Sequence, residues 1–181
     1  MRVSKRTIYK TFWGDEMKHK QLFEKAYSRL TALYSGEYHA PDARILSRFH
    51  HEKMILQESA LYMRYLDFLG RLRAIAEEKG EHILVRGAAG SSFIAYLLGA
   101  TDINPLPGHV YCPHCHRVEF QGWSSPFHHT ARKCSCGQEL ITDGHNIPFE
   151  SNIKSVLSEH IQLAVAYTSL GGRPNEKTER K

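Results

Sequence analysis

The stretch ILVRGAAGSSFIAYLLG, residues 83–99, joins an apolar, β-branched segment to an apolar helix through a turn of small residues. Residues 83–85 predict a short buried strand, and residues 91–98 predict a buried helix that Gly99 ends. A strand that enters a helix through a glycine-rich turn directs backbone N–H groups and the helix dipole at one place. The stretch therefore predicts a mixed helix and strand fold and suggests an anion site.

The turn supplies five candidate residues for binding a phosphate group: Arg86, Gly87, Gly90, Ser91 and Ser92. The hydroxyls and the guanidinium would add donors to the backbone amides. The turn lacks the lysine of a Walker A loop and is not G-x-G-x-x-G; the G-x-x-G clamp of KH modules links two helices, whereas this turn follows a strand. A plain strand-to-helix turn with a serine N-cap explains the same residues, and the local sequence alone favours it.

Helical periodicity precedes this stretch. One apolar stripe begins after Asp15, and Gly36 and Pro41 end it; its positions are Leu22, Phe23, Tyr27, Leu30 and Leu33. Asp42 is a candidate helix start, and helical spacing then continues to about Lys79-Gly80. This second region is one long helix or two helices divided at Gly70 or at residues 58–59.

Cysteines define a different segment, with CPHC at 112–115 and CSC at 134–136. Paired spacing in a chain without a secretory leader indicates a metal rather than disulfides. Cys112, Cys115, Cys134 and Cys136 would satisfy a structural zinc ion, which can stabilise a segment that is poor in aliphatic residues. Because C-x-C is a tighter chelate than C-x-x-C, nearby histidines stay open as replacement ligands: His114, His116, His128 and His129.

The bulk composition sets wider limits. The 181 residues carry 24 Lys and Arg against 19 Asp and Glu, and the net charge of +5 permits nucleic-acid contact without requiring it. No charged and apolar leader and no run of about 18 apolar residues is present, which predicts a cytoplasmic protein that does not enter membranes. No Ser-His-Asp or Cys-His nucleophile arrangement has support in the sequence.

Three segments in order resemble the catalytic core of PolC-type bacterial DNA polymerase III α subunits, the C family of replicative polymerases: VRGAAGSSFIAYLLGATDINPLPGHVYCPHC at 85–115, KCSCGQEL at 133–140 and DGHNIPFE at 143–150. In that family an R-G-S-x-G-S-S turn holds the triphosphate of the incoming nucleotide, in a palm related to nucleotidyltransferases. The resemblance implies this role for the five turn residues and makes phosphate binding the favoured interpretation. Ala88 stands where the family's turn usually has a serine.

The chain departs from the family after DGHNIPFE. Family members continue to P-D-I-D-L-N-F-S, whose two aspartates hold Mg²⁺; the same distance here reaches IQLAVAYTS, with Gln162 and Ala164 at the aspartate positions. A shift of two residues offers His160 and Gln162, and no register supplies two carboxylates. Two-metal phosphoryl transfer needs anionic oxygen ligands, so we expect neither bound Mg²⁺ nor a catalytic residue in this chain.

The sequence thus predicts an α+β fold: a partial nucleotidyltransferase-like palm (81–108 and 141–170), an N-terminal helical region (1–80), an inserted zinc ribbon (109–140) and a disordered tail (171–181). The predicted function is a degenerate, non-catalytic module that binds zinc, a nucleotide or nucleic acid, or a replication protein. Two alternatives stay open: one part of a split DNA polymerase, active only when a partner chain supplies the aspartates, and a zinc-ribbon adaptor that binds proteins.

Overall fold

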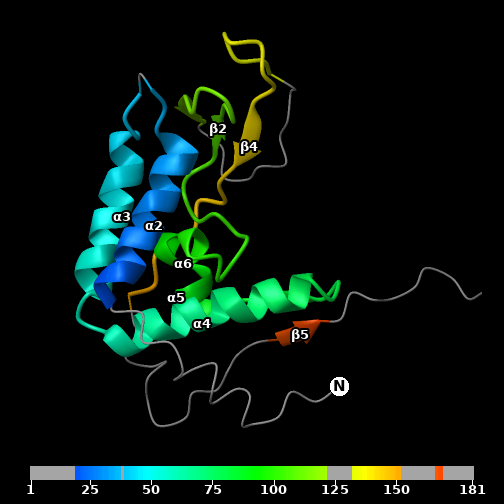
Figure 1. Cartoon of the computed structure of the whole chain (residues 1–181). Coiled ribbons are helices and arrows are strands. Elements are labelled where there is room, and N and C mark those ends of the chain that lie inside the picture. The colour runs from blue at the N-terminus through cyan, green and yellow to red at the C-terminus, as the bar shows by residue number, and fades with distance from the viewer. Residues whose placement is uncertain (1–18, 38, 122–131, 152–165, 169–181) are drawn as a thin grey trace, which may run out of the picture.

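The computed structural model describes residues 19–37, 39–121, 132–151 and 166–168 (Figure 1). The part of the predicted helical region before residue 19 lies outside these residues, and so do His128, His129, His160, Gln162, Ala164 and the predicted tail. In chain order the elements are α2 (His19–Tyr34), α3 (Ala43–Leu56), α4 (Ala60–Glu77), β1 (His82–Leu84), α5 (Gly87–Gly90), α6 (Phe93–Leu97), β2 (His109–Tyr111), β3 (Val118–Phe120), β4 (Ile141–Asp143) and β5 (Ala166–Thr168). The predicted mixture of helices and strands is confirmed.

Helix α6 lies at the centre of the core, in contact with α2, α3 and α4 (Figure 1). Four of its five residues are buried, which confirms the prediction that the apolar segment after the turn forms a buried helix. The C-cap of the helix is Leu98, and the chain turns away at Gly99, whose φ of +78° suits glycine; the Ala100 N–H donates to the Ala95 carbonyl at 2.9 Å. The left-handed conformation of Gly99 thus stops the helix after five residues.

Helices α2 and α3 form a hairpin on one side of α6 (Figure 1). The buried side of α2 contains Phe23 and four residues that repeat every four positions: Leu22, Ala26, Leu30 and Tyr34. Asp42 caps α3, because its carboxylate accepts the Arg44 N–H at 2.8 Å, which confirms the predicted helix start. Tyr27, which the periodicity placed on the apolar stripe, is 42% exposed.

The second helical region divides into two helices, and the break lies at residues 57–59. Ser59 is the N-cap of α4, with its hydroxyl 3.4 Å from the Tyr62 N–H. Gly70 lies inside α4 and does not interrupt it. A Cβ at this position would come within 2.6 Å of the Leu98 carbonyl oxygen, so the glycine allows α4 to approach the end of α6.

The strands form two small antiparallel sheets. The first pairs β1 with β5, with Ile83 opposite Tyr167, and the second is three-stranded in the order β3-β2-β4. Strand β4 lies on the palm side of the predicted ribbon boundary at residue 140, yet it pairs with β2, with Val110 opposite Thr142. The three-stranded sheet therefore extends from residue 109 to residue 143 around the cysteines. No helix in the described part of the chain is long and apolar enough to span a bilayer.

Candidate metal centre and phosphate-binding turn

The four cysteines converge at the end of the three-stranded sheet. Their sulfur atoms all lie within 4.8 Å of one another, with Cys112 Sγ 3.4 Å from Cys136 Sγ and Cys115 Sγ 3.4 Å from Cys134 Sγ. Four sulfurs around one zinc ion at about 2.3 Å are about 3.8 Å apart, so the cluster has the size of a zinc tetrahedron. Within the described residues, this is the one group of three or more possible metal ligands that lies close enough to share an ion.

The backbone shapes the cluster into two knuckles. Strand β2 leads into the first, in which Cys115 N–H points at Cys112 Sγ at 3.4 Å and His116 N–H donates to the Cys112 carbonyl at 3.0 Å. In the second, Gly137 N–H donates to the Cys134 carbonyl at 2.9 Å. The residue after the last cysteine of each knuckle has a positive φ, +60° at His116 and +87° at Gly137.

The chemistry of the donors fits zinc. Thiolate sulfur is the form that binds zinc. Hydrogen bonds from the Cys136 N–H and the Cys115 thiol lower the pKa of Cys134 to about 6, whereas hydrogen bonding to the neighbouring thiols raises the pKa of Cys115 and Cys136. Cys112, Cys115, Cys134 and Cys136 would hold the ion as a closed set of four ligands, whose contribution is folding energy rather than catalysis. His116 binds elsewhere, because its Nδ1 donates to the Leu33 carbonyl at 3.0 Å.

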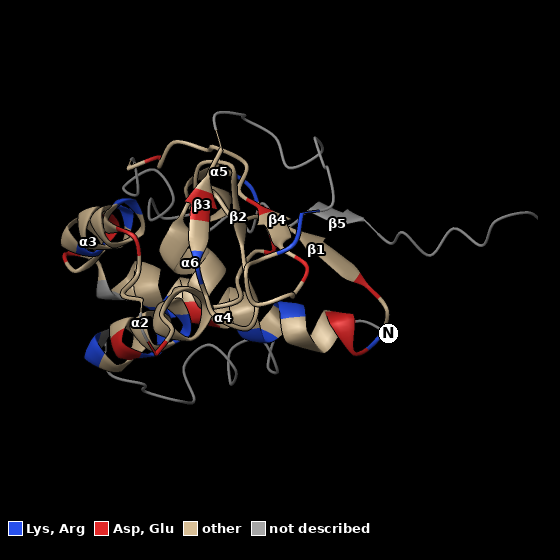
Figure 2. Cartoon of the chain, turned by 90° about the horizontal axis from the view of Figure 1, so that it is seen from above, with Lys and Arg blue, Asp and Glu red and all other residues tan. Residues whose placement is uncertain are grey.

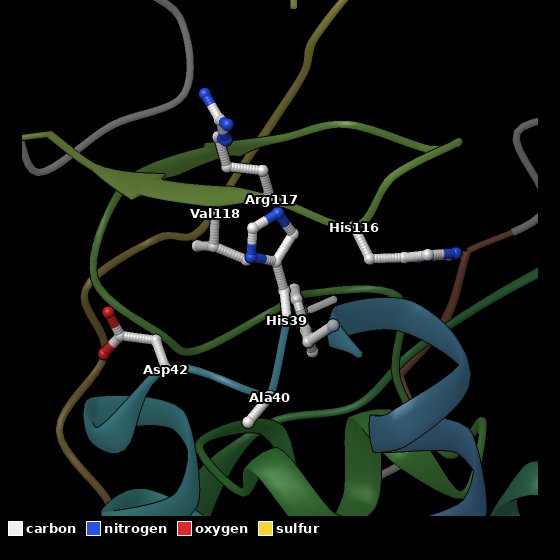
Figure 3. Close-up of a pocket in the computed structure, with 7 residues that line it drawn as sticks. His39, Ala40, Asp42, His116, Arg117 and Val118 are labelled. Atoms are coloured by element: carbon white, nitrogen blue, oxygen red, sulfur yellow. The ribbon is translucent and has the colours of Figure 1, made fainter. Parts of the chain in front are cut away.

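A pocket of about 150 Å³ lies where the ribbon meets the turn between α2 and α3 (Figure 3). His39 rises into it toward Val118, whereas Asp42 and His116 point to opposite sides. The Asp42 carboxylate is already bonded to the Arg44 guanidinium at 3.0 Å. The polar groups therefore do not converge on a single ligand, and the pocket marks the seam between ribbon and hairpin.

The structure divides the predicted phosphate turn into a helical turn, α5, and the start of α6. Ser92 is the N-cap of α6, where its hydroxyl accepts the Ala95 N–H at 3.1 Å, as the plain interpretation of the turn predicts. Ser91 Oγ donates to the Ala88 carbonyl at 3.2 Å and accepts the Glu150 N–H at 3.0 Å. Both serines are buried, so their hydroxyls serve contacts within the protein in this structure.

Glu52 of α3 occupies the place where an anion would meet the start of α6. Its side chain is 0% exposed and accepts hydrogen bonds from Ser92 Oγ at 2.7 Å, Phe93 N–H at 2.9 Å and Ile94 N–H at 3.0 Å. The Nε of Arg48 pairs with the same carboxylate at 2.5 Å. A carboxylate of the chain itself therefore neutralises the positive end of α6.

Arg48 also connects this turn to residues 147–150, which follow the cysteine segment, through hydrogen bonds and a ring contact. Its guanidinium donates to the Ser91 carbonyl at 2.7 Å and to the Ile147 carbonyl at 3.1 Å, and it lies 5.9 Å from the ring centroid of Phe149. Together with the bond from Glu150 to Ser91, these contacts bring DGHNIPFE against the Gly-Ser turn. Two of the motifs that carried the resemblance are thus in direct contact.

The outer side of the turn presents Arg86 and Gly87, which are exposed. Gly87 has a φ of +66°, and a Cβ on it would lie 3.9 Å from a carboxylate oxygen of Glu150. Gly90 faces inward, since a Cβ there would meet the Val85 carbonyl oxygen at 2.5 Å. Phosphate binding by this turn stays a prediction. Of the five candidate residues, Arg86 and Gly87 are the ones that are exposed to solvent.

Sequence reasoning missed Arg48 and Glu52, although one signal was available. Glu52 falls on the buried stripe of α3, at the spacing of the apolar residues Ile45, Phe49 and Leu56. A carboxylate on such a stripe is rarely buried without partners. The arginine four residues before it was the obvious partner on the same helix face.

A buried polar network links the helical body to the ribbon. Asn104 Nδ2 donates to the Tyr34 hydroxyl at 2.9 Å and to Asp143 Oδ2 at 2.6 Å. His109 Nδ1 donates to the Pro107 carbonyl at 2.8 Å, so its Nε2 accepts from the Tyr34 hydroxyl at 3.3 Å. This arrangement requires a neutral imidazole at His109.

The network predicts that acid destabilises the protein. Burial lowers the pKa of His109 below its ordinary value of about 6.5, and the Pro107 carbonyl and Asp143 offset only part of this effect. The unfolded chain then binds the proton more readily, so the free energy of unfolding falls as the pH drops below about 6.5, by up to about 1.4 kcal/mol per pH unit until the folded pKa is reached.

Urea denaturation between pH 7.5 and pH 5 measures this effect. The His109→Gln variant should show a flatter dependence on pH, whereas His114→Ala, which changes an exposed histidine of the same ribbon, should keep the wild-type slope. Equal slopes in all three proteins would exclude a role for His109.

Comparison with known proteins now identifies the family. The model of the bacterial DNA polymerase III alpha NTPase domain matches residues 19–156, which is more than half of the 181 residues. The chain belongs to this family. The matched residues include helices α2 to α6, the Gly-Ser turn, the cysteine cluster and DGHNIPFE.

Its relatives in this family include proteins named DNA polymerase III PolC-type. The chain is 46% identical over 137 residues to the one from Staphylococcus haemolyticus and 33% identical over 137 residues to the one from Staphylococcus saprophyticus; each match covers 74% of this chain and 9% of the relative. It is 41% identical over 80 residues to the one from Streptococcus thermophilus, which covers 42% of the chain and 6% of the relative. The chain thus spans less than a tenth of the length of these relatives, and the resemblance to PolC-type polymerases is confirmed.

Proposed function

We propose that this chain is a zinc-stabilised module of DNA replication that binds a nucleotide or nucleic acid and does not polymerise DNA on its own. The observation that carries the proposal is a contrast along the chain. The turn, the cysteine cluster and DGHNIPFE lie within the family match, which covers residues 19–156. Beyond it, Gln162 and Ala164 are the residues that the resemblance to PolC-type polymerases aligns with the two aspartates. Neutral or apolar side chains there do not balance the charge of two Mg²⁺ ions.

The arrangement of β1, β5 and α6 supports a palm-like core. Strand β1 leads into the Gly-Ser turn and pairs antiparallel with β5, which follows Gln162 and Ala164 in the chain. The turn therefore follows a strand whose partner, β5, begins two residues after Ala164 in the sequence. This chain order suits a palm in which the triphosphate of a nucleotide lies at the turn.

The charge distribution indicates how such a ligand would be held. In the described residues, Lys and Arg are matched in number by Asp and Glu, so the net charge of +5 comes from the segments before residue 19 and after residue 168. Figure 2 shows the two signs interspersed along α2, α3 and α4. Binding by the described part of the chain then depends on local donors such as Arg86, not on a broad basic surface.

The turn is tested by Arg86→Ala. Loss of one guanidinium that pairs with a phosphate costs about 1.5 to 3 kcal/mol, so the affinity for a deoxynucleoside triphosphate should fall by about tenfold or more. Isothermal titration calorimetry measures this change. The control is Arg64→Ala, which removes an exposed arginine from α4. If the two variants bind the nucleotide equally well, Arg86 does not hold the phosphates.

Single-stranded DNA is the alternative ligand of the same module. The affinity for a labelled oligonucleotide, measured by fluorescence anisotropy between 50 and 200 mM salt, distinguishes DNA from a nucleotide as the ligand. Neutralisation of DNA phosphates by lysine and arginine should make the affinity fall steeply with salt. An affinity that stays flat over this range would rule out DNA as the ligand and leave the nucleotide.

One part of a split polymerase is the second candidate function. The observation in its favour is the small size of the β1 and β5 sheet, which has two strands of three residues each in the described part of the chain. Such a pair gains stability from further strands. Primer extension that appears only when a second purified chain with paired carboxylates is added would favour this function.

A further inference from the structure

The two cysteine knuckles differ at one equivalent position. Gly137 occupies the left-handed conformation in the second knuckle at no steric cost, but His116 occupies it in the first, with a φ of +60°. A histidine in this conformation is unfavourable unless its side chain gains something in return. The side chain of His116 reaches outside the ribbon, where its Nδ1 donates to the Leu33 carbonyl at 3.0 Å.

The Leu33 carbonyl lies in the last turn of α2, where carbonyl groups have no partner within the helix. Figure 3 shows His116 extending from the ribbon over the end of this helix. The backbone of the same knuckle is also in close contact with the hairpin, because a Cβ on Gly36 would come within 2.5 Å of the Cys115 carbonyl oxygen. A metal ligand and its neighbour thus dock on the hairpin directly.

We propose that His116 couples the metal centre to the α2 and α3 hairpin, so that zinc binding and docking of the ribbon stabilise each other. Docking holds Cys112 and Cys115 in the geometry that the ion needs, and the ion holds His116 and the Cys115 carbonyl in the geometry that the hairpin needs. Coupling of this kind is reciprocal by thermodynamic necessity. The inference does not depend on phosphate binding by the Gly-Ser turn.

Zinc affinity of the full chain, measured by competition with a chromophoric chelator, tests the proposal from the ribbon side. His116→Gly keeps the left-handed backbone and removes the donor, so zinc should bind roughly five- to tenfold more weakly. Gly36→Ala should also weaken zinc binding, because its methyl group meets the Cys115 carbonyl. The matched control is His114→Ala, an exposed histidine of the same knuckle, which should bind zinc like the wild type.

Hydrogen exchange tests the proposal from the helix side. Removal of zinc from the wild type should speed amide exchange in the last turn of α2 and in residues 35–37, and zinc-loaded His116→Gly should already exchange faster there. The proposal is wrong if the His116→Gly chain binds zinc as tightly as His114→Ala, or if exchange in the last turn of α2 is the same with and without zinc. A wild-type chain that binds no zinc would overturn it as well.

Discussion

Removal of zinc should unfold the three-stranded sheet and lower the thermal midpoint of the whole protein. The cysteine segment contains few aliphatic residues, and the binding free energy of a structural zinc ion is folding free energy, about 10 to 16 kcal/mol in isolated zinc-finger peptides. The packed helices α2, α3, α4 and α6 bury an apolar core that contains no metal ligand, so we expect a smaller loss here, of at least about 3 kcal/mol. For a chain of this size that loss lowers the midpoint by roughly 6 to 12 °C.

The substitution Cys112→Ser removes one of the four candidate ligands and should have the same effect as a strong chelator, because Cys112 is a buried member of the cluster. Elemental analysis of the zinc content and circular dichroism during heating measure both parts of the prediction. Ser135→Ala is the control, since Ser135 is an exposed residue between two ligands. An unchanged midpoint after complete removal of the metal would contradict a structural zinc site.

Loss of the Glu52 carboxylate should destabilise the protein by about 3 to 5 kcal/mol. Glu52→Ala leaves the guanidinium of Arg48, which is 18% exposed, without its partner and leaves the N–H groups of Phe93 and Ile94 without acceptors. Removal of one partner of a buried ion pair has a cost in this range. The free energy of unfolding from urea denaturation measures the effect.

The control for this prediction is Glu58→Ala, an exposed glutamate just after α3, which should change stability by less than about 0.5 kcal/mol. In the double variant Arg48→Ala with Glu52→Ala, the combined loss should be smaller than the sum of the two single losses, because each single change strands the other charge. A Glu52→Ala protein within 1 kcal/mol of the wild type would show that the carboxylate is not a structural partner of the turn.

Local patterns were sufficient to predict the helices and the cysteine cluster. Helical spacing, the Asp42 cap and the possible break at residues 58–59 all depend on neighbours in sequence, and the structure has the helix start and the break at these places. Cysteine spacing likewise indicated a group of thiols that the structure brings within 4.8 Å. These features follow from backbone propensity and chelate geometry, which short segments contain in full.

Long-range contacts could not be predicted in the same way. Glu52 and Ser92 are 40 residues apart, and His116 and Leu33 are 83 residues apart, so nothing in either local segment shows that they meet. Strand β4 has three residues, too few for a period of two to appear in the sequence, and only its pairing with β2 places it in the ribbon sheet. The burial of the Ser91 and Ser92 hydroxyls in protein contacts depends on packing of the same kind.

Template-directed primer extension by the purified, zinc-loaded chain tests the central claim most directly. With Mg²⁺, all four deoxynucleoside triphosphates and a primed template, we predict no added nucleotide, because Gln162 and Ala164 supply no carboxylates for the two metal ions. Extension of the primer by this chain without any partner would contradict the account and show that other residues hold the catalytic ions.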